Sequence, residues 1–244
     1  MKRSEFAARV WSKLVAFESE QGFFPRGSSV LAAVSGGPDS VCLAHWLAFQ
    51  ARRKGLRVEL LHVHHGLRGR AADADARSVL ALGKALGLPA SVVKAPVRAA
   101  AKARGLGLEE AGRKARYAAL LARARRGRFA AVATGHQLDD QAETVLLHLL
   151  RGTSLEGLGG IAPRRALAPR VSLVRPLLPL TRAEVALYLK ANGLTAREDA
   201  SNRDPKFTRN WVRREILPRL ERRAPGVKER LSGLAAKVRA ATGR

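Results

Sequence analysis

The chain has 244 residues but little cysteine and no long apolar run, and these shortages exclude several kinds of protein. A single cysteine, Cys42, excludes a disulfide framework and a zinc site built from cysteines. No run of about 18 apolar residues occurs, so we expect no membrane-spanning helix. Charges among Met1–Glu5 replace the apolar core of a signal peptide, and we therefore expect a cytoplasmic enzyme.

The ordinary phosphate-binding motif G-x-x-x-x-G-K-[ST] is also missing. In its place, residues 35–40 read S-G-G-P-D-S between an apolar run at 30–34 and an apolar helical stretch at 41–49. A glycine loop between a strand and a helix directs free backbone amides at an anion. The segment therefore predicts a phosphate site, with Asp39 suited to a phosphate-bound Mg²⁺. A glycine-rich turn without a ligand is the alternative.

Acidic residues are scarce relative to basic ones. The chain has 45 Lys and Arg against 20 Asp and Glu, a formal net charge of +25. This excess is more than solubility requires and indicates a polyanionic partner, for which nucleic acid is the first candidate. A basic surface that contacts only solvent is the alternative.

Strand-like and helix-like patterns alternate along the chain. We expect strands at 29–34, 58–63, 90–94, 129–134 and 171–174, and helices at 5–20, 39–54, 73–86, 109–126, 139–150, 181–192 and 228–240. This alternation predicts an α/β fold with a parallel sheet covered by helices on both faces. In such sheets ligands bind at the carboxyl ends of the strands, where the strand order reverses. Residues 35–40, 62–68 and 134–140 follow such ends, so we expect them to share one crevice.

A second polar segment, 135–144, reads G-H-Q-L-D-D-Q-A-E-T. The carboxylates of Asp139, Asp140 and Glu143 fall on the first turn of a predicted helix. A helix N-terminus favours acidic residues by about 0.3–1 kcal/mol each, which is the purely structural explanation. In a basic protein, and beside a phosphate loop, such a group is also suited to Mg²⁺ or to the ammonium group of an amine substrate.

Three histidines, His62, His64 and His65, have a spacing that metal sites also show. No nearby cysteine or acidic residue completes a ligand set. We therefore favour stacking on a nucleotide, hydrogen bonding to it, or capping of the following loop.

These segments together resemble the tRNA(Ile)-lysidine synthetases, a family within the PP-loop ATP pyrophosphatases. The S-G-G-x-D-S loop alone is shared by the whole ATP pyrophosphatase group, whereas its combination with D-D-Q-A-E-T and S-N-x-D-x-x-F-x-R-N is highly specific. The segments that carry the resemblance are Ser35–Ser40, His62–Arg68, Glu109–Tyr117, Gly135–Thr144, Leu149–Gly157, Arg175–Leu178 and Asp199–Arg213.

The resemblance implies a PP-loop, Rossmann-like fold and a carbon–nitrogen ligase that uses ATP and Mg²⁺. A cytidine at the first position of the CAU anticodon of tRNA(Ile) would be adenylated at its C2 oxygen, with release of pyrophosphate. The ε-amine of L-lysine would then attack C2 and expel AMP. The partners implied are tRNA(Ile), L-lysine and ATP, and no membrane.

The resemblance also assigns roles to residues of this chain. The ATP site comprises Ser35, Gly36, Gly37, Pro38, Asp39, Ser40 and His62, with Asp39 holding the metal. Residues expected in catalysis are Asp39, Arg113, His136 and Asp140. Residues expected to bind the amine or the tRNA, or to close over the nucleotide, are Asp140, Glu143, Arg209, Asn210 and Arg213. Helix-surface charge is the alternative for the last three.

The chain departs from the family at several places. Gln137 stands where a second histidine is common, and Gly112 replaces an alanine. We expect a catalytic domain at 1–215 and a basic helical tail at 216–244, followed in the family by one or two further domains. The chain is then either a natural minimal form or a shortened one. The apolar stripe of the helix at 228–240 would need another surface or a second subunit, so a homodimer is one prediction.

Three other functions compete with lysine ligation. Related enzymes that thiolate tRNA need cysteines, and Cys42 alone speaks against them. Relatives that amidate small molecules need an ammonia source, and no glutaminase segment is present. A basic RNA-binding module with an inactive nucleotide fold would have lost the glycines and carboxylates of these motifs, which are all present.

Overall fold

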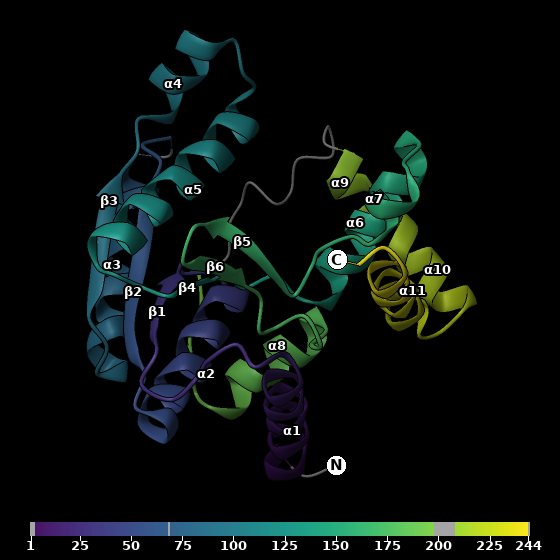
Figure 1. The fold of residues 1–244 in the computed structure, drawn as a ribbon, viewed down its shortest axis with the longest axis horizontal. Coiled ribbons are helices and arrows are strands. Elements are labelled where there is room, and N and C mark those ends of the chain that lie inside the picture. The colour runs from purple at the N-terminus through teal and green to yellow at the C-terminus, as the bar shows by residue number, and fades with distance from the viewer. Residues whose placement is uncertain (1–2, 68, 198–207, 244) are drawn as a thin grey trace.

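A six-stranded sheet forms the centre of the molecule (Figure 1). The computed structural model describes residues 3–67, 69–197 and 208–243. The strands lie in the order β3-β2-β1-β4-β6-β5, which reverses direction at the neighbours β1 and β4. This order opens a crevice beyond the carboxyl ends of β1 and β4. The strands are β1 (Ser29–Ala33), β2 (Arg57–His64), β3 (Ala90–Lys94), β4 (Ala131–Ala133), β5 (Arg164–Ala168) and β6 (Val171–Val174).

Helices cover both faces of the sheet, as predicted. Alternate residues of each strand face opposite sides, so Val30 and Ala32 join one core and Leu31 joins the other. We call the sheet and these helices the sheet body. The helices of the first face are α1 (Arg3–Gln21), α2 (Pro38–Lys54), α3 (Arg70–Leu86) and α8 (Arg182–Ala191), and those of the second are α4 (Val97–Arg104) and α5 (Leu108–Arg126).

The sheet is mostly parallel, as predicted, and departs from this arrangement at one edge. The edge strand β5 pairs antiparallel with β6, whereas the other four pairings are parallel. Only Pro169 and Arg170 connect β5 to β6. A link of two residues can join antiparallel strands, whereas a parallel pair needs a crossover of a dozen or more. We did not predict β5, nor α4.

The second part of the molecule is helical and lies beside the sheet body at the right of Figure 1. Its apolar core is small and consists of Ala142, Leu147, Val212 and Leu217, with Leu231 packed against it. We call this part the helical lobe. Its elements are α6 (Leu138–Arg151), α7 (Leu155–Leu158), α9 (Thr208–Trp211), η2 (Val212–Ile216), α10 (Leu217–Arg223) and α11 (Val227–Ala241).

The last helix has its own packing surface within the chain. Helix α11 packs along α6, so Ala235 and Val238 are buried and Leu231 is partly buried, while Leu234 stays exposed. The stripe is therefore mostly covered by this chain. The homodimer and the domain boundary after residue 215 stay predictions.

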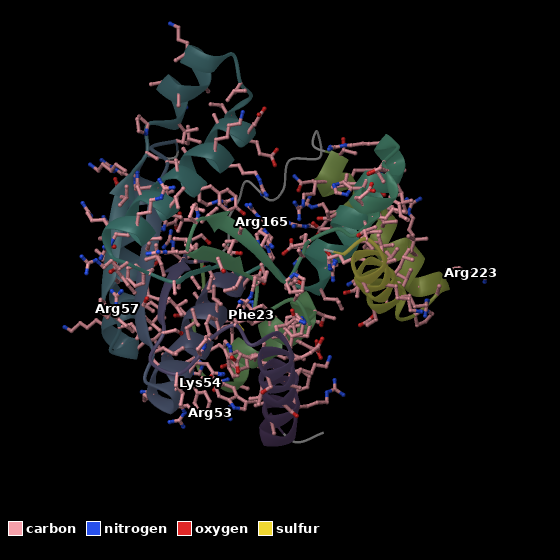
Figure 2. All side chains as sticks on the ribbon, viewed as in Figure 1. Phe23, Arg53, Lys54, Arg57, Arg165 and Arg223 are labelled. Carbon is pink, nitrogen blue, oxygen red and sulfur yellow. The ribbon has the colours of Figure 1, made fainter. Side chains whose placement is uncertain are left out.

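Two expectations from composition can be compared with the structure. Cys42 is fully buried, and this burial raises the pKa of its thiol. Among the described helices, none is long and apolar enough to cross a bilayer. Basic side chains extend outward from both parts of the molecule, as Arg57 and Arg223 illustrate (Figure 2).

Candidate active site

The segment between β1 and α2 folds around a single oxygen atom. The amides of Ser35 and Gly36 both donate to Ser40 Oγ at 3.2 Å, and this hydroxyl donates to the Gly37 carbonyl at 2.9 Å. Gly36 has φ +94°, a conformation that favours glycine. The loop thus directs its amides at an oxygen at the N-terminus of α2, which is the geometry that suits a phosphate.

A second glycine brings the segment after β4 into contact with the first turn of α2. Gly135 follows β4, and a Cβ built there would lie 3.0 Å from both the carbonyl carbon and oxygen of Asp39. Any larger residue would push the two segments apart. Glycine at 135 therefore allows the 135–144 segment to lie directly against the phosphate loop.

Asp39 is the residue best placed to meet a metal ion. Burial and the neighbouring Asp140 raise the pKa of its carboxyl group to about 7. Its Oδ1 is buried and has no hydrogen-bond partner among the described residues. A divalent cation would satisfy this oxygen, and Mg²⁺ commonly takes one or two carboxylates together with phosphate oxygens. No cluster of three or more His, Cys, Asp or Glu residues that could hold a metal is found in the described parts of the chain.

Helix α6 begins in the crevice with a capping arrangement. Gln137 Oε1 accepts from the Asp139 amide at 2.9 Å, and the Gln137 amide donates to Asp140 Oδ2 at 3.1 Å. Gln137 is fully buried. The departure from the family at this position therefore has a structural role, because the side chain ends the loop and orients the first turn of α6.

The three carboxylates of this turn are buried, and basic residues contact each of them. Asp139 accepts from Lys228 Nζ at 2.6 Å and from the Arg182 amide at 2.8 Å. Burial alone would raise the pKa of Asp139, but these hydrogen bonds hold it below its usual value. Lys228 lies on α11 and Arg182 begins α8, so this carboxylate links the helical lobe to the sheet body.

Glu143 lies at the centre of a network of arginines. Its carboxylate is fully buried and accepts from Arg213 Nε at 2.6 Å, Arg209 Nε at 2.9 Å and Arg182 Nη2 at 3.2 Å. Burial raises the pKa of Glu143, but Arg213 and Arg209 lower it by more. Glu143 is therefore held as a carboxylate.

Asp140 differs from Glu143 in its proton affinity. Its Oδ1 lies 3.2 Å from Arg209 Nη2 and 3.4 Å from Arg213 Nη2. Burial and the negative charge of Glu143 raise the pKa of Asp140. We call Asp140 and Glu143 the acidic pair. The pair combines a fixed negative charge with a second group that accepts a proton more readily than an ordinary aspartate.

His136 lies between the acidic pair and a group of basic residues. Its Nδ1 is 2.9 Å from Thr134 Oγ1. Burial, followed by the charges of Arg175, Arg116, Arg209 and Arg113, lowers the pKa of the imidazole to about 3. The ring is therefore neutral at pH 7 and can donate or accept a hydrogen bond there.

Three other predicted residues remain to be placed. His62 Nδ1 is 2.9 Å from the Val34 carbonyl, so the ring donates to the segment that leads into the phosphate loop. Arg113 is exposed on α5, with its guanidinium 5.2 Å from the centroid of the Tyr117 ring. Asn210 is buried on α9, next to Arg209.

The structure thus brings the predicted residues into one connected region. The charges of Asp140 and Arg213 shift the pKa of Asp39, and those of Arg209 and Arg113 shift the pKa of His136. The pairing of Arg209 and Arg213 with the acidic pair excludes simple surface charge for both. Residues 199–207 and Arg68, which contribute to two of the resembling motifs, lie outside the described residues.

Several residues of the site carried no signal that the sequence analysis used. Arg182 and Lys228 reach Asp139 and Glu143 from distant helices. Arg197 donates its amide to the Gly36 carbonyl at 3.0 Å and its side chain to Asp75 at 2.7 Å. Only the fold brings these positions to the crevice. Arg175 also lies near His136, and only its place in the resembling segment Arg175–Leu178 pointed to it in the sequence.

Comparison with known proteins agrees with this geometry. Residues 9–220 match the PP-loop domain family. A tRNA(Ile)-lysidine synthase from Dehalococcoides mccartyi is 43% identical over 214 residues, covering 86% of this chain and 45% of that protein. The Geobacter sulfurreducens protein of that name is 42% identical over 228 residues, covering 93% of this chain and 47% of its own length. The chain thus spans less than half the length of these relatives.

Solved structures share the fold at lower sequence identity. A U34-tRNA thiolase from Methanococcus maripaludis, solved with its [4Fe-4S] cluster, superposes with a TM-score of 0.78 at 19% identity and covers 98% of this chain and 80% of that one. An NMN synthetase from Francisella tularensis gives 0.56 at 17% identity, covering 97% and 94%. At these identities the likeness concerns the fold.

Proposed function

Because the chain belongs to the PP-loop domain family, we propose that it uses ATP to replace the C2 oxygen of a tRNA cytidine with the ε-amine of lysine. The substrates are then ATP, L-lysine and tRNA(Ile) with a CAU anticodon. The products are tRNA with lysidine at the first anticodon position, AMP and pyrophosphate. The proposal is supported by relatives named tRNA(Ile)-lysidine synthase.

The first step activates the base. The C2 oxygen of cytidine attacks the α-phosphorus of ATP, a new P–O bond forms, and the bond to pyrophosphate breaks. The amides of the Ser35–Ser40 loop bind the phosphates, and Mg²⁺ held at Asp39 would neutralise charge on the leaving pyrophosphate. Arg113 and neutral His136 supply donors to the oxygens on which charge develops.

The second step joins lysine to the base. The neutral ε-amine attacks C2, the C2–O bond breaks, and AMP leaves with the former C2 oxygen. The amine must lose a proton before or during attack, and Asp140 is suited to accept it because burial and Glu143 raise the pKa of its carboxyl group. Glu143 keeps its negative charge and orients the amino acid.

One observation carries the proposal. In a chain with a net charge of +25, a buried acidic pair lies beside the phosphate loop and already binds two cationic side chains, Arg209 and Arg213. A site that holds guanidinium groups there is chemically suited to an ammonium group. Lysine would take over part of these contacts, and the displaced arginines, with Asn210 between them, would be available to phosphates of the RNA.

The proposal is tested by incorporation of labelled lysine. The protein is incubated with ATP, labelled L-lysine and a tRNA(Ile) transcript with a CAU anticodon, and the label in RNA is counted. We expect label with the wild type and none with Asp39→Ala. Glu110→Gln, which removes an exposed carboxylate on α5, is the matched control and should keep full activity.

Three results would contradict this function. Equal incorporation of label by Asp39→Ala would show that the proposed phosphate site takes no part in the reaction. Equal incorporation into a transcript without the CAU anticodon would refute the substrate. AMP release that needs tRNA but not lysine would favour a thiolation reaction, although Cys42 is buried in the core.

A further inference from the structure

Three arginines surround the ring of Tyr117. The guanidinium carbon lies 5.2 Å from the ring centroid for Arg113, 5.5 Å for Arg165 and 5.9 Å for Arg116. Two of these side chains come from α5 itself and Arg165 comes from the edge strand β5. Each benefits from the ring face, but together they place like charges near one another.

A fourth arginine borders the same ring from beneath the surface. Arg175 is 5% exposed and donates from Nη1 to the Ala162 carbonyl. Arg175 interacts with the Tyr117 side chain, but its Nε and the Tyr117 hydroxyl are both buried and neither makes a hydrogen bond of ordinary geometry among the described residues. Buried polar groups normally have well-formed partners, so two groups with only this mutual contact need a reason. We call Tyr117 with Arg113, Arg116, Arg165 and Arg175 the Tyr117 cluster.

The arginines of the Tyr117 cluster differ from those around Glu143. Arg209, Arg213 and Arg182 each contact a carboxylate, as described above. Within residues 3–67, 69–197 and 208–243, none of the four cluster arginines lies within 4.0 Å of a carboxylate oxygen. Burial raises the pKa of Tyr117, but the surrounding positive charge lowers it by more. The charge of the cluster is thus uncompensated within the described chain.

The cluster borders the crevice but lies away from the phosphate loop. Arg175 directly follows β6, which runs parallel to β4, so this part of the cluster lies at the same carboxyl ends of the strands as His136. Arg165 lies on β5, three strands from β1 in the sheet order. At about 4.8 Å per strand this separates the two strands by roughly 14 Å. An anion bound at Arg165 is therefore a different group from the one on the phosphate loop.

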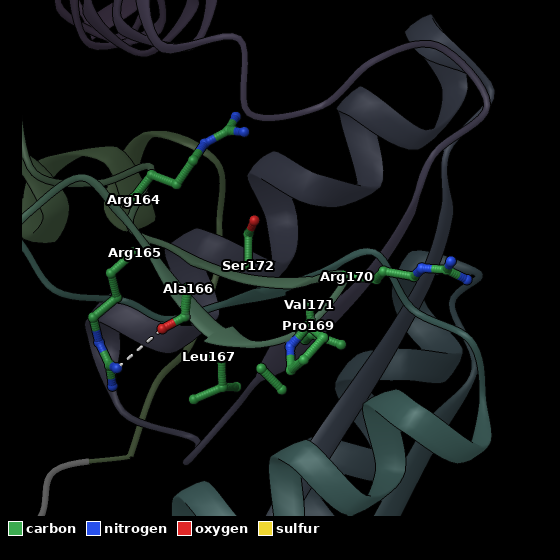
Figure 3. A pocket seen from close by; sticks show the side chains of 9 residues that line it. Arg164, Arg165, Ala166, Leu167, Pro169, Arg170, Val171 and Ser172 are labelled. Carbon is green, nitrogen blue, oxygen red and sulfur yellow. Dashed lines mark hydrogen bonds between the residues drawn. The ribbon is translucent and has the colours of Figure 1, made fainter.

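The β5–β6 hairpin explains why only one of its arginines joins the cluster (Figure 3). Arg164 and Arg165 point to opposite sides of the strand. Arg164 donates to the Gln21 and Gly22 carbonyls after α1, whereas Arg165 extends over Tyr117. The hairpin residues 164–172 also line an open hollow of about 730 Å³ on this side of the molecule. A chain-like ligand could continue past Arg165 along the hairpin.

We propose that the Tyr117 cluster binds a phosphodiester group of the RNA chain next to the reacting base. Guanidinium groups offer planar pairs of N–H donors that match phosphate oxygens, and the buried Nε of Arg175 and the Tyr117 hydroxyl would gain an acceptor. The proposal rests on the proposed function, because it assumes that RNA enters the crevice. It assigns a role to Arg165 and Tyr117 that the resembling motifs do not give them.

The test compares two arginine variants of the full chain. Arg165→Gln removes a cluster charge from an exposed edge strand, and Arg126→Gln removes an exposed charge from the last turn of α5. The affinity for a CAU anticodon stem-loop is measured by fluorescence anisotropy at several salt concentrations. The affinity for ATP is measured on the same preparations by calorimetry, which also confirms folding.

We expect Arg165→Gln to weaken RNA binding by about tenfold and to reduce the slope of log affinity against log salt by about one, as for one lost phosphate contact. ATP affinity should not change, and Arg126→Gln should alter neither property. Arg165→Lys, which keeps a point charge without the planar donors, should restore the salt slope but only part of the affinity.

Three outcomes would overturn the proposal. Loss of ATP affinity instead of RNA affinity would assign the cluster to the nucleotide. Equal effects of Arg165→Gln and Arg126→Gln would mean that RNA binding depends on overall charge and not on the cluster. If the wild type does not bind the stem-loop, RNA is not the ligand of the cluster. Failure of the proposed function is distinct from these, because it is an absence of labelled lysine in RNA while RNA binding and its salt slope are still measured.

Discussion

In the sheet body, the buried residues of β1, β4 and β6 are apolar, whereas the helical lobe meets that body through Asp139, Asp140 and Glu143. The sheet body has two large apolar cores and the lobe has one small one. Apolar burial is non-directional and insensitive to moderate salt. The lobe depends instead on particular partners, such as Lys228 for Asp139.

This difference connects stability with function. The carboxylates that hold the lobe are also the ones proposed to bind the amine substrate. In the proposed reaction, the ammonium group of the ligand would compete with Arg209 and Arg213 for the oxygens of the acidic pair. The sheet body can keep its shape during this exchange, because its cores contain none of these groups.

The largest effect is expected from Glu143→Gln. The change removes the buried carboxylate that Arg182, Arg209 and Arg213 share and leaves only Asp140 for the last two. Breaking a buried pair costs about 3–5 kcal/mol. The free energy of unfolding from urea denaturation measures the loss. Glu110→Gln is the control: its ion pair with Lys114 is exposed and should change the same quantity by less than about 0.5 kcal/mol. Similar losses in both variants would mean that the lobe is not held by its charges.

A smaller and local effect is expected from Lys228→Gln. The variant removes the charged hydrogen bond from α11 to Asp139, worth about 2 kcal/mol. Amide hydrogen exchange should become faster in α11 but not in β1, because the sheet body does not depend on this contact. Lys237→Gln, an exposed position of the same helix, should leave exchange unchanged. Faster exchange in β1 as well would contradict the division into two differently held parts.

A still smaller effect concerns pH. The pKa of His136 is about 3 in the folded protein, below the ordinary value of about 6.5 for an unfolded chain. Stability from this residue is therefore complete above pH 6.5 and is lost as the pH falls toward 3, because only the unfolded state takes up the proton. Between pH 7 and pH 5, His136→Gln should lose about 1.9 kcal/mol less unfolding free energy than the wild type. An imidazole NMR signal of His136 that titrates near pH 6.5 would refute this.

The smallest effect is a gain within the sheet body. A Cβ at Gly112 would lie 3.8 Å from Val97 Cγ1, an ordinary contact, so Gly112→Ala should stabilise α5 by about 0.5–1 kcal/mol. Thermal unfolding measures the gain. Gly83→Ala, also in a helix, should destabilise instead, because its Cβ would lie 2.5 Å from Ala90 Cβ. A loss of stability in Gly112→Ala would show that this helix needs the glycine.

Most periodic elements of the sheet body were predictable, whereas in the helical lobe only α6 and α11 were. Strands at 29–33 and 90–94 and helices such as 108–126 follow from apolar patterns that face a large core. The segment 208–223 has no such pattern, and its residues are ordered by Val212 and Leu217 in a small core and by ion pairs with α6. Local periodicity contains no information on partners 70 residues away.

The candidate site shows the same division. The phosphate loop and the acidic turn were identified because glycines and clustered carboxylates have chemical meaning within a few residues. The Arg182, Lys228 and Arg165 contacts could not be identified, because a basic side chain in a basic protein carries no local signal. Their roles depend on which distant element they face.

The order of residues by itself determined the strand–loop–helix unit at 29–54 and the acidic start of α6, since backbone conformation and helix electrostatics act over a few residues. Only the tertiary structure decided that β5 runs antiparallel, that arginines from α8 and η2 meet Glu143, and that α11 reaches Asp139. Such contacts depend on burial, which removes competing water and fixes partners that are far apart along the chain.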